Sequence, residues 1–259
     1  ININNQLNDK LIIDKNNLIH LDERLHARFK TASKKIIPFI DNIIGKSSVI
    51  YLERLSDIEG IKGDITDIRI GYDKKILNLS LKHNHHAFKH QRPPSTPQQM
   101  GFNKHSPEDK WFREKYRLLM DSFLKKTKGE LLFRNISSLI PQDLYYPVCN
   151  HVNDFINKFG SNDYAANSYF SFLIGQKNFK KIIVNESNIE IFHFDQIPNS
   201  NKMSSVVEGA SYIKVNFYNG YKLKMRLHTA SSKITNTPSL KFDTQSDGEI
   251  PVKKTIIKL

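Results

Sequence analysis

The chain has 259 residues, of which 39% are hydrophobic, and its 39 Lys and Arg against 26 Asp and Glu give a formal net charge of +13. This length suffices for one large or two small domains with a substantial core. Positive charge spread along the chain suits a polyanion such as DNA or RNA, although a basic protein without such a partner would have the same composition. The single Cys149 excludes a disulfide framework and a cysteine-based zinc site. No apolar run reaches the roughly 18 residues that span a bilayer, so we expect no membrane association.

The first part of the chain predicts a polar start followed by helix. Residues 1–17 are rich in Asn and predicted to be loosely ordered, and because the chain begins without methionine we expect further residues before Ile1. From 17 to about 44, Leu, Ile and Phe recur at helical spacing, with a break expected near Pro38. Residues 47–64 predict a short helix or strand and then a loop.

The stretch 63–92 carries the most chemical information. Its segments 68–70 and 76–82 alternate between apolar and polar side chains, which predicts two adjacent strands. Asp67 enters the first strand, and Lys82 ends the second on the same face. The face expected to be open carries Asp67, Arg69, Asn78, Ser80 and Lys82, and the face expected in the core carries Ile68, Ile70, Leu77, Leu79 and Leu81.

Helices are predicted beyond this stretch. Residues 92–105 are rich in Pro and Gly and predict an irregular loop. Helices are expected over 106–128, 141–158 and 163–174, the first of them capped by Ser106. Their expected buried side chains include Trp111, Phe112, Leu118, Leu119, Phe123, Tyr164, Tyr169, Phe170 and Phe172.

Strand patterns dominate the C-terminal third. Segments 179–184 and 189–194 are rich in branched and aromatic residues, and segments 212–218 and 221–228 flank Asn219-Gly220, a strong hairpin signal. The second hairpin strand places four basic side chains on one face, namely Lys222, Lys224, Arg226 and His228. This face either contacts DNA or is the solvent-exposed face of a half-buried sheet. We therefore expect an α/β protein with a mixed central sheet and an additional C-terminal antiparallel β part.

Asp67 and Lys82 supply groups that phosphodiester hydrolysis needs. A carboxylate can hold a divalent ion, and a lysine can orient water and stabilise the charge that develops on phosphate. Mg²⁺ takes oxygen ligands, typically from one or two carboxylates, so Asp64 is a candidate second acid and Glu53 or Glu59 further candidates. A structural ion pair would explain the same two residues on neighbouring strands.

This arrangement resembles the PD-(D/E)XK nuclease core. An acid, here Asp67, enters one strand, and about fifteen residues later a lysine, here Lys82, lies on the neighbouring strand. The second half of that core is normally an acid, any residue and then lysine, whereas this chain has Ser80-Leu81-Lys82. The resemblance implies that the backbone carbonyl of Leu81 helps to hold the metal. The serine leaves the full set of metal ligands open.

The segment LKHNHHAFKHQRP, with GDITD before it and RLHTASSKI and PSLKFD after it, resembles the HaeIII-type family of type II restriction endonucleases. This resemblance implies a restriction-endonuclease-like mixed sheet flanked by helices. It also implies Mg²⁺-dependent double-strand cleavage of DNA at a short palindrome, GGCC, in a bacterial, cytoplasmic restriction–modification system. Mn²⁺ or Ca²⁺ would substitute for Mg²⁺ in binding. A palindromic site further implies a homodimer, because the two share a two-fold axis.

The resemblance also assigns roles to residues. Asp67, Lys82 and Asp64 would be catalytic, with the metal held by Asp67, Asp64 and Leu81. Within a single nuclease domain we expect an N-terminal helical part (1–60), a catalytic core with helices (61–177) and a DNA-contacting β-rich part (178–259). Candidate DNA contacts are His83, Asn84, His85, His86, Lys89, His90, Arg92, Lys224, Arg226, His228, Ser231, Ser232 and Lys241. Guanine-rich sites favour Arg92, Arg226 and Lys241 for base contacts. Lys89 and Lys224 would make phosphate contacts that do not depend on the DNA sequence.

Three alternative interpretations of this stretch arise. The first is an HNH nuclease, because His83-Asn84-His85 spells those letters, but it is excluded since three consecutive residues cannot present three side chains to one ion. Histidines 83, 85, 86 and 90 can instead bind zinc, with His86 and His90 one helical turn apart. The third alternative is a degenerate core that binds DNA without cleaving it. Separately, an active core of the same kind would also fit a repair nuclease that cuts branched DNA.

Overall fold

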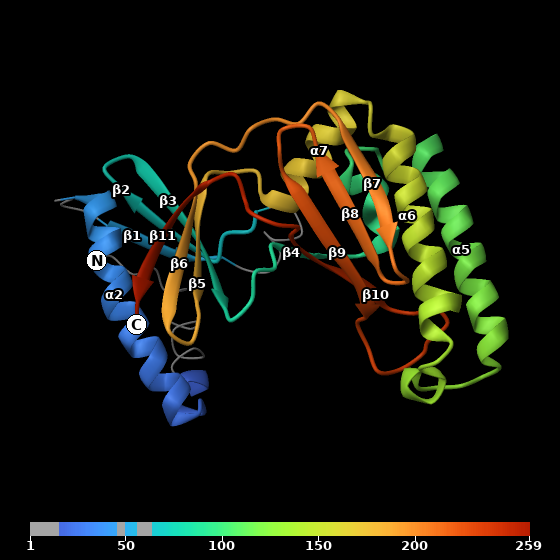
Figure 1. The fold of residues 1–259 in the computed structure, drawn as a ribbon, viewed down its shortest axis with the longest axis horizontal. Helices are drawn as coiled ribbons and strands as arrows, with labels where there is room; N and C mark the ends of the chain where they lie inside the picture. The colour runs from blue at the N-terminus through green and yellow to red at the C-terminus, as the bar shows by residue number, and fades with distance from the viewer. Residues whose placement is uncertain (1–15, 46–49, 56–63) are drawn as a thin grey trace. The chain divides into compact units, whose positions relative to one another are not determined.

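The computed structural model describes residues 16–45, 50–55 and 64–259, which form two compact units (Figure 1). Unit 1 contains the described residues up to His86, together with 176–197 and 252–259. Unit 2 contains residues 87–175 and 198–251. Each unit is built on its own β-sheet, and the fold is mixed α/β as predicted. None of the described helices is long and apolar enough to cross a membrane.

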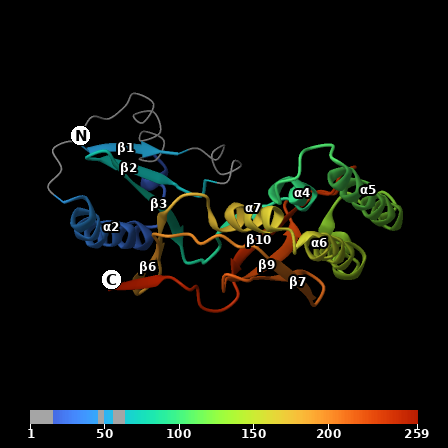
Figure 2. The same cartoon turned by 90° about the horizontal axis from the view of Figure 1, so that it is seen from above.

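The sheet of unit 1 is mixed. In spatial order its strands are β1 (Ile50–Arg54), β2 (Ile68–Tyr72), β3 (Lys75–His83), β5 (Phe179–Val184), β6 (Asn188–Phe194) and β11 (Lys253–Lys258). The β3–β5 pair is parallel and the other pairs are antiparallel. Helix α2 (Glu23–Ile44) covers one face, where its apolar side packs on Leu77, Leu79, Ile182 and Ile191 (Figure 2).

Helix α2 passes through Pro38 without ending, so the break expected there is wrong. Its N-terminus is capped by Asp22, whose carboxylate accepts the backbone N–H groups of the next turn. Ile36 lies before the proline and Phe39 and Ile43 after it, and all three pack against the sheet. Burying this apolar face on both sides offsets the hydrogen bond that proline removes.

The opposite face of this sheet, here called the polar face, carries Asn78, Ser80 and Lys82 of β3. Asn78 and Ser80 are buried rather than open to solvent, with Ser80 only 1% exposed, so the expectation of an open face is wrong for these two. On the other face, Leu81 was expected in the core and is exposed. The polar groups of Asn78 and Ser80 are satisfied within unit 1. The Asn78 side chain donates to the carbonyl of Asn178 (2.9 Å) and accepts from Arg69 (3.2 Å).

Unit 2 holds an antiparallel sheet packed on helices (Figure 1). Its strands in spatial order are β4 (Lys89–Gln91), β10 (Leu240–Ser246), β9 (Lys222–Thr229), β8 (Tyr212–Phe217) and β7 (Met203–Glu208). Its longer helices are α5 (Pro107–Thr127), α6 (Tyr146–Phe159) and α7 (Asp163–Ile174), and its short helical turns are Pro93–Ser95, α4 (Thr96–Gln99), Phe133–Ile136 and Ile140–Tyr145. The predicted hairpin around Asn219-Gly220 is confirmed, and Phe170 of α7 packs edge-on against Phe217 of β8.

Two expectations for unit 2 are wrong. Residues 92–105, expected to be irregular, include two short helical turns, because each has a proline in its first two positions, where the fixed φ of proline suits a first turn. Trp111, Leu118 and Tyr164 were expected inside and are exposed. Helix α5 instead buries Phe112, Tyr116, Met120 and Phe123, a stripe spaced by three or four residues that leaves Trp111 and Leu118 outside.

Candidate active site

Asp67 and Lys82 lie beside each other at the edge of the polar face of unit 1. The Asp67 N–H donates to the carbonyl of Leu79 (2.8 Å), which extends the β2–β3 ladder by one residue. Its Oδ2 accepts the N–H of Leu81 (2.6 Å) and lies 3.5 Å from Lys82 Nζ. The Ser80 hydroxyl donates more weakly to the same oxygen, at 3.4 Å. The side chains of Asp67 and Lys82 are 45% and 20% exposed, so solvent reaches both.

The Asp67 carboxylate suits a hard divalent ion. Its Oδ2 is held by Leu81, while Oδ1 makes no hydrogen bond to any residue that the structure describes. One free carboxylate oxygen fits Mg²⁺, which keeps several waters and takes further oxygens from substrate phosphate. Within the described ranges, no three His, Cys, Asp or Glu side chains gather in a way that could hold a metal ion.

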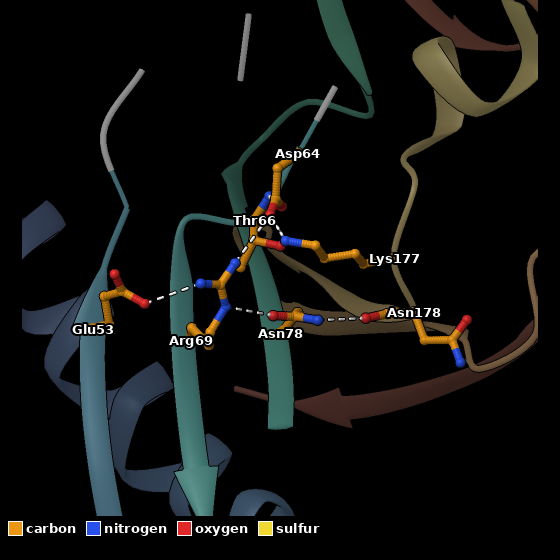
Figure 3. A network of polar contacts seen from close by, with 7 residues as sticks. All are labelled: Glu53, Asp64, Thr66, Arg69, Asn78, Lys177 and Asn178. Carbon is orange, nitrogen blue, oxygen red and sulfur yellow. Dashed lines mark hydrogen bonds and ion pairs between the residues drawn. The ribbon is translucent and has the colours of Figure 1, made fainter. Parts of the chain in front are cut away.

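Asp64, the candidate second acid, is held in a polar network (Figure 3). It is 7% exposed, and its Oδ2 accepts from Lys177 (2.8 Å) and Arg69 (3.0 Å) while Oδ1 accepts from the Thr66 N–H (3.0 Å). Burial raises the pKa of Asp64, but the hydrogen bonds from Lys177 and Thr66 outweigh it and leave the pKa below its ordinary value. Asp64 can therefore hold an ion only after Lys177 or Arg69 moves away.

Arg69 is the centre of this network. Its guanidinium also donates to Glu53 of β1 (3.0 Å) and to Asn78 of β3 (3.2 Å), so one side chain connects three strands (Figure 3). Glu53 is therefore already paired in unit 1. Glu59, the other acid considered as a ligand, lies outside the described residues.

Replacing Arg69 by methionine will lower the free energy of unfolding by about 2 kcal/mol or more, because the buried Asp64 loses a charged donor. Urea unfolding at pH 7 measures this. At that pH Asp64 is ionised in both states, since its folded pKa is lowered from 3.8. The part of the stability that comes from the lowered Asp64 pKa, which the hydrogen bonds from Lys177 and Thr66 cause, is complete above the ordinary value of 3.8 and is lost as the pH falls below it.

Lys177→Met is the matched control for Arg69. Lys177 bonds the same carboxylate, but its side chain is 52% exposed, so its loss will cost below about 1 kcal/mol. Equal losses from the two variants would show that Arg69 does not hold this network together.

The histidine-rich run after β3 divides between packing and exposure. The His83 ring packs edge-on against Phe29 of α2, with centroids 5.0 Å apart, and its Nε2 is buried. His86 Nε2 lies 3.6 Å from Glu190, and burial lowers the pKa of its imidazole. Asn84 and His85 are exposed, as is His86. Asn84, His85 and His86 are therefore the members of this run in unit 1 that a ligand can reach.

In unit 2 the outer face of the sheet holds the basic stripe of β9, interleaved with acids. Lys224 pairs with Glu208 of β7, and both His90 and His228 face Asp243 of β10. The sequence did not predict that Glu208 and Asp243 lie here, because they belong to other strands and the residue pattern of β9 contains no information about its partners. Arg226 is exposed on this face, and no residue that the structure describes pairs with it.

The remaining candidates of unit 2 have varied surroundings. Lys89 Nζ lies 3.8 Å from the centroid of the Phe172 ring, so it points inward. The Arg92 guanidinium donates to Ser239 Oγ (2.7 Å) and to a backbone carbonyl. Ser231 and Ser232 are exposed and Lys241 is half-buried.

Comparison with known proteins places this chain in a class. A family model described as HaeIII restriction endonuclease matches residues 2–205. The type II restriction enzyme HaeIII of Haemophilus aegyptius is 25% identical over 280 residues, which covers 93% of this chain and 83% of that protein. No solved structure matches. The molecule is a type II restriction endonuclease, a site-specific deoxyribonuclease. Within that class, the chain belongs to the HaeIII restriction endonuclease family.

Proposed function

We propose that this chain cuts both strands of DNA at a short palindrome, GGCC, with Asp67 and Lys82 at the scissile phosphate. The supporting observation is the Asp67–Lys82 pair, 3.5 Å apart and reached by solvent at the ends of two inner strands, in a chain of a restriction endonuclease family. The site sequence is proposed by likeness to the HaeIII enzyme, which is 25% identical. A palindromic site favours a homodimer, and the class of enzyme favours a bacterial cytoplasm.

The reaction is proposed to depend on Mg²⁺, for which Mn²⁺ would substitute, whereas Ca²⁺ would support binding. Asp67 Oδ1 would hold the ion, with the Leu81 carbonyl, waters and phosphate oxygens as further ligands. A bound ion supplies a more acidic water and a polarised phosphate. Lys82 orients the attacking water and stabilises negative charge on the phosphate. In this proposal Asp64 is a second ligand of the ion only if the ion replaces Lys177 as the partner of its carboxylate.

The proposed DNA contacts follow from exposure. In unit 1 they are Asn84, His85 and His86. In unit 2 they are on the outer face of the sheet, with Ser231 and Ser232 beside it. The members of that face are His90, Lys224, Arg226, His228 and Lys241, and Arg92 is a further candidate.

Arg226→Ala will weaken DNA binding by about tenfold, because an exposed arginine without a protein partner is available to phosphate or to guanine. Titration of cognate and scrambled duplexes at one salt concentration measures the loss. A loss confined to the cognate duplex means a base contact, and a uniform loss means a phosphate contact. The control is Lys222→Ala, which removes one charge from the same strand face. Unchanged binding by the Arg226 variant would remove this face from the proposal.

The overall proposal is tested by incubating the protein with Mg²⁺ and two plasmids, one containing GGCC sites and one without them. Discrete fragments from the first plasmid alone are expected. Fragments from both would mean another recognition sequence, and cleavage confined to branched DNA would mean a repair nuclease. Binding without cleavage would mean a degenerate core.

A further inference from the structure

A second lysine lies next to the candidate site and is buried. Lys181 of β5 is 1% exposed. Register pairs it with Ser80, so its side chain is on the polar face, whereas the neighbouring Lys180 points to the face covered by α2. Burying a lysine is unfavourable unless polar groups meet its amine. A buried lysine in register with this site therefore requires a physical reason.

The Lys181 amine has a defined environment. Its Nζ donates to the backbone carbonyl of His86, four residues after Lys82 on the segment that leaves β3. Burial first, and then the positive charge of Lys82, lower the pKa of Lys181 to about 7. The register agrees with this, because Lys82 pairs with Ile183, which is two residues from Lys181 and on the same face of β5.

The order of the strands sets what Lys181 can do. Because β3 lies between β2 and β5, Lys82 has the Asp67 carboxylate on one side and the Lys181 amine on the other. The Asp67 carboxylate attracts the Lys82 ammonium, and the Lys181 amine, when protonated, repels it. Both interactions direct the Lys82 ammonium toward Asp67.

We propose that Lys181 is a positioning residue of the cleavage site, which anchors the His86 carbonyl and keeps the Lys82 ammonium directed toward Asp67. The proposal rests on the proposed role of Lys82. Lys181 does not reach DNA itself, because its side chain is covered. Replacing Lys181 is therefore expected to lower the rate at which bound DNA is cleaved and to leave the affinity for DNA unchanged.

Lys181→Met tests this, because methionine fills a similar volume without the amine. Single-turnover cleavage of bound DNA is expected to slow by about tenfold to a hundredfold, the effect of a misplaced catalytic group, with the dissociation constant for DNA changed less than twofold. Lys181→Gln keeps a donor for the His86 carbonyl and is expected to retain an intermediate rate. Lys180→Met is the matched control, since it removes a buried lysine from the opposite face of the same strand and is expected to cleave normally when folded.

Several results would overturn the proposal. They are normal cleavage by folded Lys181→Met, an equal loss in Lys180→Met, or a loss that appears in DNA affinity. If the methionine variant does not fold, the glutamine variant decides by the same rate measurement, and failure of both to fold would make Lys181 a structural residue only. Lys82→Ala separates the two proposals. If it cleaves normally, the assigned site is wrong, and if it is inactive while Lys181→Met is normal, only this inference fails.

Discussion

Replacing Lys82 by alanine is expected to slow DNA cleavage by at least about a thousandfold, while cognate DNA binding stays within about tenfold. Lys82 Nζ lies 3.5 Å from Asp67 Oδ2, and its side chain is mostly covered. It is therefore placed to act on a phosphate held by Asp67 and offers little surface to the rest of the DNA. Its loss removes charge stabilisation needed only as the bond breaks, which lowers the rate on bound DNA.

Two measurements separate these effects. Single-turnover cleavage with Mg²⁺ gives the rate on bound DNA, and binding with Ca²⁺ in place of Mg²⁺ gives affinity. Lys75→Ala is the control, because Lys75 is an exposed lysine at the start of the same strand and its loss changes net charge equally. If Lys82→Ala cleaves DNA as fast as the Lys75 variant, Lys82 is not part of the site.

The Asp67–Lys82 pair was predictable because its determinants are local. Alternation within 68–70 and 76–82, together with the short turn between them, defines a hairpin, and its register brings the two residues together. The bounds of α5 and α7 were predictable for the same reason, and Ser106 caps α5 as expected. The cap of α7 was not named in advance, and it is Asn162, which accepts the Ala165 N–H.

The surroundings of the pair were not predictable, because they come from distant parts of the chain. β5 joins β3 in parallel from about a hundred residues away, and it brings Lys181 with it. The segment before β5 also covers Asn78 and supplies Lys177 to Asp64. No periodicity within 63–92 indicates these partners, so a face that is polar in sequence becomes partly buried in the structure.

The continuity of α2 through Pro38 and the exposure of Trp111 have a related cause. Local propensity is overruled wherever tertiary packing decides which side of a helix is covered. For α2 the sheet of unit 1 covers the apolar residues on both sides of Pro38, and for α5 the covered stripe passes through Phe112 and not through Trp111.

Asp67→Asn is expected to reduce cleavage by at least about a thousandfold, and a higher Mg²⁺ concentration will not restore it. Asparagine retains an oxygen that can accept the Leu81 N–H, so the contact between residue 67 and the end of β3 is kept. The amide lacks the negative charge that holds a divalent ion. The loss therefore comes from the ion and not from misfolding.

The same variant is expected to bind DNA without metal at least as tightly as the unaltered protein, because it removes a half-exposed negative charge from the place proposed for a phosphate. Opposite signs for cleavage and metal-free binding distinguish a metal ligand from a residue that only supports the fold, since a structural loss would weaken both. Asp73→Asn, in the exposed turn at the other end of β2, removes an equal charge where asparagine tolerates the positive φ, and it will leave both measurements unchanged. If added Mg²⁺ restores cleavage to Asp67→Asn, or if its metal-free binding falls, Asp67 does not hold the ion and the structural ion pair is the correct explanation of its contact with Lys82.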